Sequence, residues 1–242
     1  MNWVGAAKPL DDIDLPRIGH RIGVGEDEIH AVLDVEAGKS GFDSLKRVKP
    51  LFEPHIFYRQ LGPGTLRDKA VAQGLAYPTW RLNYPADSYP RIEAAMKIHP
   101  VAALHSASWG RGQIMGYNHG AAGYADVMAM IEAFKADEEN HVDAMVSFIA
   151  TNQIDDNLRA HDWAGFAKVY NGPSYAVNKY DIKLRDAFAK WQKIRDTAWL
   201  PNLELSPVTA PKPIEVVATL EHDALARALD REARIRAILD EV

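Results

Sequence analysis

The sequence predicts a mainly α fold of the α+β type, in which helices surround one small β-region. Apolar residues recur at helical spacing through most of the chain, whereas residues 48–59 are aromatic, β-prone and interrupted by prolines. The length of 242 residues suffices for one sizeable core and an appendage. We therefore expect a main domain over residues 1–195, a proline-rich linker over residues 196–213 and a C-terminal amphipathic helix over residues 214–242.

The composition is that of an ordinary globular protein and argues against several classes of function. The chain is 47% hydrophobic and 25% charged, and its net charge of −5 gives no support for nucleic-acid binding. The absence of cysteine excludes disulfides, thiol catalysis and thiolate metal sites. No segment is apolar for long enough to span a bilayer, and the N-terminus does not resemble a secretory signal, so we expect no membrane insertion.

The first strong helix pattern ends at a glutamate. Apolar Ile29, Val32 and Leu33 form one face, and the next position on that face is Glu36. Gly38 offers a helix stop just beyond it. Burial and the negative end of the helix dipole both disfavour an ionised carboxylate, and a carboxyl that keeps its proton near neutral pH can act as a general acid. The stretch alone leaves equally open a Glu36 that turns out to solvent.

The next segment, residues 48–59, is expected to form a short extended piece or hairpin beside the helix end. It places Glu53 between two apolar runs. If the segment folds back over Glu36, it brings a second carboxylate to the same place. The alternative is that Glu53 binds its own backbone or pairs with Arg59.

A long aromatic loop is expected over residues 63–90, where the aromatic side chains could stack on sugar rings or simply cover the core. A helix follows over residues 91–99. In residues 106–116, small residues surround Trp109 and Gln113, which indicates tight backbone packing near a cleft.

Residues 121–150 form the longest helix pattern, and Glu138 and His141 fall on its apolar stripe. Glu138 is therefore expected to be a semi-buried carboxylate, and His141 a hydrogen-bonded core histidine rather than a metal ligand. The sequence has no HExxH or HxxxH motif, so neither a metal nor any other cofactor is expected.

Two more helices complete the main domain. Asp162 is expected to cap a helix over residues 163–170, which the Tyr-Asn-Gly-Pro turn then ends, and residues 180–191 form the last core helix. In the C-terminal helix the charges alternate in sign, which favours docking on the domain or self-association over membrane binding.

Three pieces of this sequence stand in an order that resembles the lysozyme-like superfamily. They are a helix-end Glu36 followed by Ala37 and then Gly41-Phe42, a segment with Ser106 or Ser108, Gly110, Gln113 and Ile114, and the turn Tyr170-Asn171-Gly172. Four longer motifs resemble more closely the N-acetylmuramidase family of phage endolysins and prophage lysozymes. The resemblance covers about residues 10–193. The matching motifs are Val35-Glu36, Leu51-Phe52-Glu53-x-His55-x-Phe57, Ser106-Ala107-Ser108-Trp109-Gly110-x-x-Gln113-Ile114-Met115-Gly116-x-Asn118-His119, and Tyr170-Asn171-Gly172-Pro173-x-Tyr175-x-x-Asn178-x-Tyr180-Asp181.

The resemblance implies a lysozyme-like fold with the small β-region beside a substrate cleft, and cleavage of the β-1,4 bond between N-acetylmuramic acid and N-acetylglucosamine in bacterial peptidoglycan. It implies Glu36 as general acid, and we choose Glu53 as the second carboxylate. Gln113, Tyr170 and Asn171 are expected to hold the substrate or the Glu36 carboxyl. Ser106 and Ser108 are weaker candidates for the same role. The family often has serine after the acid, where this chain has Ala37, which puts a hydroxyl role there in doubt.

Two other functions remain open from sequence. One is a lytic transglycosylase, which would form 1,6-anhydro products without a second essential carboxylate. The other is a non-catalytic peptidoglycan-binding or phage structural protein that keeps the fold. For the leading hypothesis, a phage endolysin, we expect accumulation in the host bacterial cytoplasm and release to the cell wall through a holin-type pore.

Overall fold

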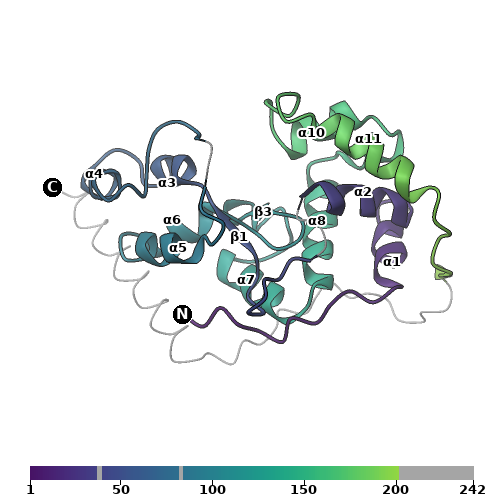
Figure 1. Cartoon of the computed structure of the whole chain (residues 1–242), viewed down its shortest axis with the longest axis horizontal. Helices are drawn as coiled ribbons and strands as arrows, with labels where there is room; N and C mark the ends of the chain where they lie inside the picture. The colour runs from purple at the N-terminus through teal and green to yellow at the C-terminus, as the bar shows by residue number, and fades with distance from the viewer. Residues whose placement is uncertain (37–39, 82–83, 202–242) are drawn as a thin grey trace. The chain divides into compact units, whose positions relative to one another are not determined.

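The computed structural model describes residues 1–36, 40–81 and 84–201 (Figure 1). Within these residues the chain forms eleven α-helices, one short 3-10 helix and three short β-strands. The predicted mainly α fold with a small β-region is therefore confirmed.

The chain separates into two compact units. One unit comprises Trp3–Trp199, and the other comprises Met1–Asn2 and Leu200–Val242. The helices and strands that the structure describes all belong to the Trp3–Trp199 unit. The predicted linker over residues 196–213 lies outside the described residues from position 202 onwards, and so does the whole predicted helix over residues 214–242.

Five helices gather around α2, which is the helix that the sequence predicts before Glu36. Helix α11 packs along α2, where the His30 ring stacks on Trp191 with ring centroids 3.6 Å apart. Asp34 accepts hydrogen bonds from Trp191 (2.9 Å) and Lys190 (2.8 Å). The helices of this group are α1 (Asp14–His20), α2 (Glu26–Glu36), α8 (Glu139–Thr151), α9 (Asp155–Arg159), α10 (Trp163–Tyr170) and α11 (Tyr180–Trp191).

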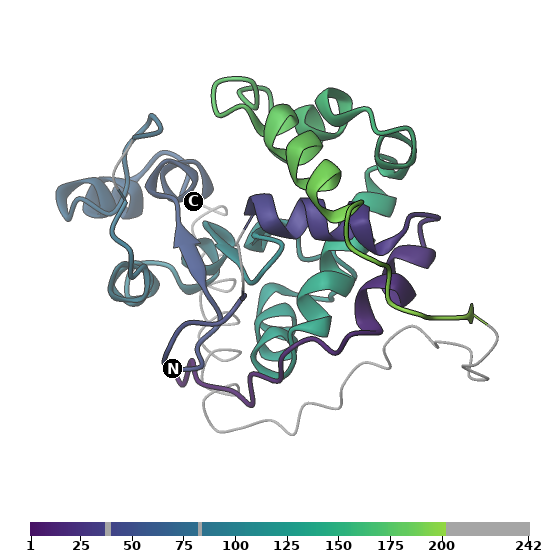
Figure 2. The same ribbon diagram turned by 45° about the vertical axis from the view of Figure 1, so that its right-hand side comes forward.

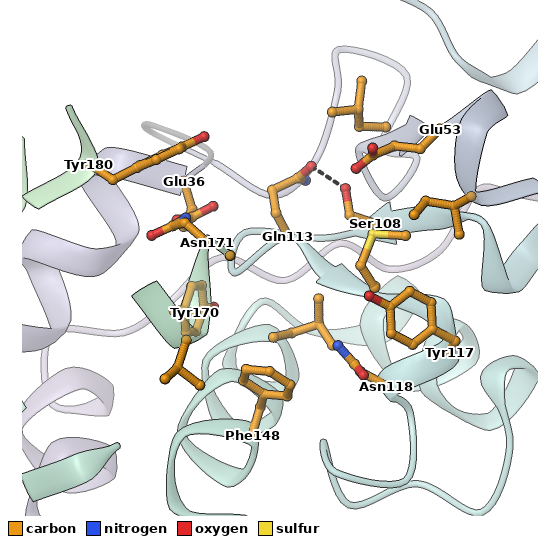
Figure 3. A pocket seen from close by; sticks show the side chains of 16 residues that line it. Glu36, Glu53, Ser108, Gln113, Tyr117, Asn118, Phe148, Tyr170, Asn171 and Tyr180 are labelled. Carbon is orange, nitrogen blue, oxygen red and sulfur yellow. Dashed lines mark hydrogen bonds between the residues drawn. The ribbon is translucent and has the colours of Figure 1, made fainter. Parts of the chain in front are cut away.

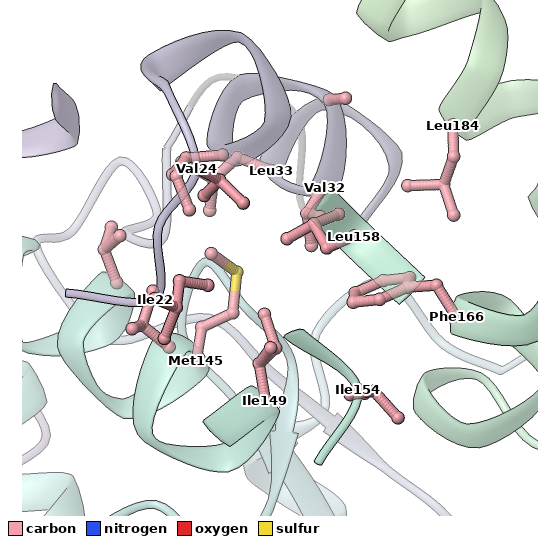
Figure 4. Packing of buried hydrophobic residues seen from close by; sticks show 14 of the residues in the cluster. Ile22, Val24, Val32, Leu33, Met145, Ile149, Ile154, Leu158, Phe166 and Leu184 are labelled. Atoms are coloured by element: carbon pink, nitrogen blue, oxygen red, sulfur yellow. The ribbon is translucent and has the colours of Figure 1, made fainter. Parts of the chain in front are cut away.

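Apolar side chains from all six helices form one buried cluster, part of which Figure 4 shows. Each large apolar side chain that is fully buried contributes about 1.5–3 kcal/mol, so the cluster fixes α2 firmly against its neighbours. The labelled members are Ile22, Val24, Val32, Leu33, Met145, Ile149, Ile154, Leu158, Phe166 and Leu184.

A three-stranded antiparallel sheet lies between this group and four further helices (Figures 1 and 2). Its strand order is β1-β2-β3, and Leu51 pairs with Ser108, which pairs in turn with Met115. The strands are β1 (Pro50–Phe52), β2 (Ala107–Trp109) and β3 (Ile114–Met115), and the helices are α3 (Pro54–Gln60), α4 (Thr65–Ala72), α5 (Tyr89–Met96) and α6 (Pro100–His105). The 3-10 helix η1 (Gly116–Asn118) follows β3 directly.

The single long helix predicted over residues 121–150 is wrong, because the chain breaks into α7 (Val127–Ala136) and α8. Asp137 adopts an extended backbone, and its side chain accepts a hydrogen bond from the Glu139 N–H at 2.9 Å, as a helix cap does. The Glu138 N–H is donated to the Lys8 carbonyl. A partner from the N-terminal segment thus replaces the helical hydrogen bond, which periodicity alone cannot reveal.

The short extended piece expected within residues 48–59 exists as β1, and it ends where Pro54 occupies the first turn of α3, in which a missing N–H costs nothing. One more expectation needs correction. In residues 63–90 the expected continuous loop is interrupted by α4. The Gly38 helix stop and Ala37 lie outside the described residues.

Candidate active site

A cleft of about 370 Å³ opens where the end of α2, the sheet and the α10–α11 connection come together. Figure 3 shows Glu36 and Glu53 on opposite sides of this cleft, with Gln113 between them. The lining residues are Glu36, Leu51, Glu53, Ile56, Ser108, Gln113, Ile114, Met115, Tyr117, Asn118, Phe148, Val169, Tyr170, Asn171, Gly172 and Tyr180.

Glu36 is the last residue of α2, and its side chain lines the cleft. Burial raises the pKa of Glu36 from 4.5 to about 7. A hydrogen bond from Asn171 and the charge of Lys183 both act to lower this pKa, but burial has the larger effect. A substantial fraction of the Glu36 side chains therefore carry a proton at neutral pH, which is the state of a general acid.

The Tyr-Asn-Gly turn after α10 meets this carboxyl. Asn171 Nδ2 donates a hydrogen bond to Glu36 Oε1 at 2.6 Å, and the Asn171 N–H bonds the Ala167 carbonyl at the end of the helix. The Tyr170 hydroxyl donates to the Gly112 carbonyl at 2.8 Å. Burial, and then the charge of Glu36, raise the pKa of Tyr170 well above its ordinary value, so Tyr170 is a neutral hydrogen-bonding group. The turn thus joins α10 to the acid and to the β2–β3 connection.

Gln113 lies in the β2–β3 connection and has a positive φ of 48°, which is uncommon for a residue other than glycine. Its Oε1 accepts a hydrogen bond from the Ser108 hydroxyl at 2.8 Å, and its Nε2 donates to the Gly110 carbonyl at 2.7 Å. Gly110 also has positive φ, and a Cβ there would lie 2.8 Å from His141 Nδ1. The tight turn that the small residues indicate therefore exists and holds Gln113 in the cleft wall.

Glu53 links β1 to α3, and its backbone N–H donates to the Ser106 carbonyl at 2.8 Å. Burial raises the pKa of the Glu53 carboxyl, and the charge of Arg59 opposes this. His55 Nδ1 is 3.4 Å from Glu53 Oε2, but burial lowers the pKa of His55, so its ring is neutral at pH 7. Glu53 therefore faces the cleft with the charge of Arg59 acting on it and with a neutral His55 as its neighbour.

The structure does not bring Ser106 to the cleft. Its side chain is fully buried, and its hydroxyl donates to the Ala102 carbonyl at 2.5 Å at the C-terminal end of α6. Ser108, in β2, does line the cleft. Of the two serines, only Ser108 can therefore take part in a substrate site.

Sequence reasoning missed three polar side chains of the cleft, Tyr117, Asn118 and Tyr180. The helix pattern predicts a core position for Tyr180, and the other two residues lie in the short η1 turn, where no periodicity marks them. The signal that could have found Asn118 and Tyr180 is their place in the motifs of the family resemblance. Trp80 is 53% exposed but does not line this cleft.

The described residues contain no group of histidine, cysteine, aspartate and glutamate side chains that could hold a metal ion. In the same part of the chain, no helix combines the length and the apolar character needed to cross a membrane.

The arrangement places a protonated carboxyl where it can act as an acid. Glu36 keeps a proton near neutral pH, and Glu53 faces it across the cleft as a second carboxyl group whose pKa burial also raises. Polar groups from the sheet and from the α10–α11 connection fill the space around them, as a polyhydroxylated substrate requires.

Comparisons with known proteins agree with this geometry. A family model described as N-acetylmuramidase matches residues 26–192. The crystal structure of the Burkholderia AP3 phage endolysin is similar to this chain, with 36% sequence identity and a TM-score of 0.68. That match covers 77% of this chain and 73% of the endolysin chain. No curated protein matches the chain.

Proposed function

The chain belongs to the N-acetylmuramidase family, and from this premise we propose that it cleaves the β-1,4 bond between N-acetylmuramic acid and N-acetylglucosamine in bacterial peptidoglycan, with Glu36 as the general acid. It is a glycoside hydrolase that acts on peptidoglycan. The observation that carries the assignment of Glu36 is its raised pKa of about 7 in a cleft wall, where Asn171 orients the carboxyl.

In this mechanism the Glu36 O–H donates its proton to the glycosidic oxygen as the C1–O bond breaks. Positive charge then develops on the sugar, in an oxocarbenium-like transition state. The water that completes hydrolysis gives its proton to the conjugate carboxylate of Glu36 where the second carboxylate only stabilises the sugar, and to the second carboxylate where that group activates the water. The Asn171 amide stabilises the Glu36 carboxylate by the hydrogen bond that it already donates.

Glu53 is proposed as the second carboxylate. Its position across the cleft from Glu36 lets it stabilise the developing positive charge or activate a water molecule on the opposite face of the sugar. The neutral His55 leaves this negative charge available to the substrate.

The test is to assay Glu36→Gln and Glu53→Gln proteins on purified peptidoglycan. Each substitution keeps the size of the side chain and removes its acid, so each is expected to lower kcat by at least about 100-fold. Glu132→Gln is the matched control, because Glu132 is a partly exposed carboxylate on α7 that does not line the cleft. A Glu36→Gln protein that digests cell walls at the wild-type rate would disprove the assignment of the acid.

Mass spectrometry of the wild-type digest separates hydrolysis from the transglycosylase alternative. We expect products with free reducing ends, because a cleft with two carboxylates can direct water to the sugar. 1,6-anhydro-muramyl products, together with a Glu53→Gln protein of nearly normal rate, would replace the hydrolase by a lytic transglycosylase.

The similarity to a phage endolysin supports a further part of the proposal, that the enzyme accumulates in the cytoplasm of a host bacterium and reaches the wall after holin-type release. Expression in a bacterium with and without a co-expressed holin tests this. We expect lysis only when the pore is present, and lysis without any pore would contradict it.

A further inference from the structure

A second hollow adjoins the cleft, and we call it the side hollow. It has a volume of about 480 Å³ and shares Leu51 and Gln113 with the cleft lining. Its other walls include Asp43, Arg47 and Lys49 from the segment before β1, together with Asp87. A substrate chain that fills the cleft therefore passes directly beside a charged recess.

The charges in the side hollow are unevenly paired. Arg47 is occupied by two carboxylates, since its Nε lies 2.7 Å from Asp43 Oδ2 and its Nη2 lies 3.2 Å from Asp87 Oδ2. The Lys49 ammonium donates to the Ser40 carbonyl at 2.8 Å, and none of the described carboxylates pairs with it. Lys49 is thus a half-buried cation whose ammonium has further hydrogen-bond donors. It lies one residue before β1, and its backbone carbonyl accepts a hydrogen bond from Gln113 Nε2 at 3.4 Å.

We propose that the side hollow binds the carboxylate-bearing substituent of N-acetylmuramic acid, with Lys49 pairing with its carboxylate. This inference rests on the proposed function. In peptidoglycan each muramic acid carries a lactyl group on which a short peptide is built, so a negatively charged branch leaves the glycan chain at every second sugar. A recess that adjoins the glycan cleft and holds an ammonium without an acidic partner fits such a branch.

The alternative is a purely structural role, in which Lys49 only anchors the chain near Glu36 through the Ser40 carbonyl. The two roles make different predictions. Loss of an anchor would slow catalysis on every glycan, because the acid would be held less well, and would lower kcat. Loss of a carboxylate contact would raise KM for carboxylate-bearing glycans and leave kcat nearly unchanged.

The experiment compares wild-type, Lys49→Gln and Lys49→Arg proteins on two soluble substrates. One is a muropeptide oligosaccharide that carries peptide stems, and the other is the same glycan after an amidase has removed the peptides and left free lactyl carboxylates. Lys97→Gln is the matched control, because Lys97 is an exposed lysine at the end of α5 that lines neither the cleft nor the side hollow. The Glu36→Gln protein shows how much of the measured cleavage depends on the catalytic site.

We expect Lys49→Gln to raise KM about fivefold to tenfold, Lys49→Arg to retain most of the affinity and Lys97→Gln to match wild type. An effect confined to the peptide-bearing substrate assigns the carboxylate to the peptide, because the lactyl carboxyl is bound as an amide there. An effect confined to the peptide-free substrate assigns it to the free lactyl carboxylate, and an equal effect on both shows that the side hollow accepts either carboxylate. An unchanged KM on both, or a lower kcat without a change in KM, overturns the proposal. A wild-type protein that cleaves neither substrate refutes the proposed function instead.

Discussion

At the scale of single residues, the Glu36 carboxyl is buried in a place that disfavours its ionised form. Burial raises its pKa, and Asn171 and Lys183 recover only part of that cost. Burial of this carboxyl therefore keeps it protonated near neutral pH and lowers the free energy of unfolding at a pH where the unfolded chain ionises it.

The raised pKa of Glu36 predicts a pH-dependent gain in stability for Glu36→Gln. In the unfolded chain this carboxyl ionises near pH 4.5, and in the folded chain near pH 7, so the folded state binds more protons in between. Stability from this group is therefore fully present below pH 4.5 and is lost as pH rises through about 7. A shift from 4.5 to about 7 corresponds to at most about 3 kcal/mol.

We therefore expect Glu36→Gln to unfold at a higher temperature than wild type at pH 8, with a smaller difference at pH 5. Calorimetric or fluorescence melting at both values measures it, and Glu132→Gln should behave alike at both. A difference that is equal at the two pH values would show that Glu36 has an ordinary pKa.

Asn171 supplies a second prediction at this scale. Its hydrogen bond stabilises the Glu36 carboxylate, so removing it by Asn171→Ala should raise the pKa of Glu36 further. The alkaline limb of the kcat/KM profile should then move to higher pH, while the maximum rate falls because the carboxyl is less well oriented. A pH profile from 5 to 9 measures both effects. A limb that stays in place or moves to lower pH contradicts the assignment of this limb to Glu36.

The sequence could indicate Glu36 as an inward-facing carboxyl because the hydrophobic period of a single helix places it on the buried face. Periodicity could not indicate Asn171 as a partner of Glu36, since 135 positions separate them and only the packing of α10 and α11 on α2 joins them. The family resemblance supplied Asn171 as a residue that holds either the substrate or the Glu36 carboxyl, and the structure places it on the carboxyl. Ser106 does not reach the cleft because α6 ends at this residue, before β2 begins, and its hydroxyl bonds the Ala102 carbonyl of that helix. The sequence pattern predicts neither this helix end nor the strand that follows.

At the scale of elements, a buried carboxylate joins three segments next to the acid. Glu138, at the start of α8, is 3% exposed. Its Oε1 accepts hydrogen bonds from the Ser40 hydroxyl (2.9 Å) and the Gly41 N–H (2.5 Å), and its Oε2 lies 3.3 Å from Arg111 Nη1. These contacts fix the chain shortly after Glu36 to both α8 and the β2–β3 connection.

Glu138→Ala is expected to lower the free energy of unfolding by about 3 kcal/mol, because it leaves Arg111 and the Gly41 N–H buried without their partner. Urea unfolding measures the change. Glu132→Ala, which removes a partly exposed carboxylate from α7, should cost less than about 1 kcal/mol. A Glu138→Ala protein as stable as the Glu132→Ala protein would show that the contacts of Glu138 contribute little.

The break between α7 and α8 shows which features of a helix can be predicted from hydrophobic periodicity and which cannot. The apolar stripe correctly predicts that Glu138 is buried and that His141 is a core residue, whose Nε2 lies 2.8 Å from the Phe134 carbonyl. It cannot predict the break, because the cause is a hydrogen bond to Lys8, more than a hundred residues earlier. The local sequence pattern therefore predicts the buried face of a helix more reliably than it predicts the residue at which the helix ends.

At the scale of the molecule, the cleft belongs to no single element. Its walls come from residues near positions 36, 53, 113 and 170, which the α2-centred helices and the sheet bring together (Figures 1 and 3). Composition and periodicity give the helices but not this convergence. The family resemblance predicted it, because the resemblance rests on the order of the same four segments.

The compact unit Trp3–Trp199 contains the whole cleft and the buried cluster, so it should fold and act without the residues that follow. We expect a protein that ends after Trp199 to keep its melting temperature within a few degrees and its rate on peptidoglycan within about threefold. If the predicted C-terminal helix mediates self-association, light scattering after gel filtration should give a monomer for this shortened protein and a larger mass for the full chain. Equal masses would exclude that role, and a shortened protein that unfolds or loses activity would show that the domain extends beyond Trp199.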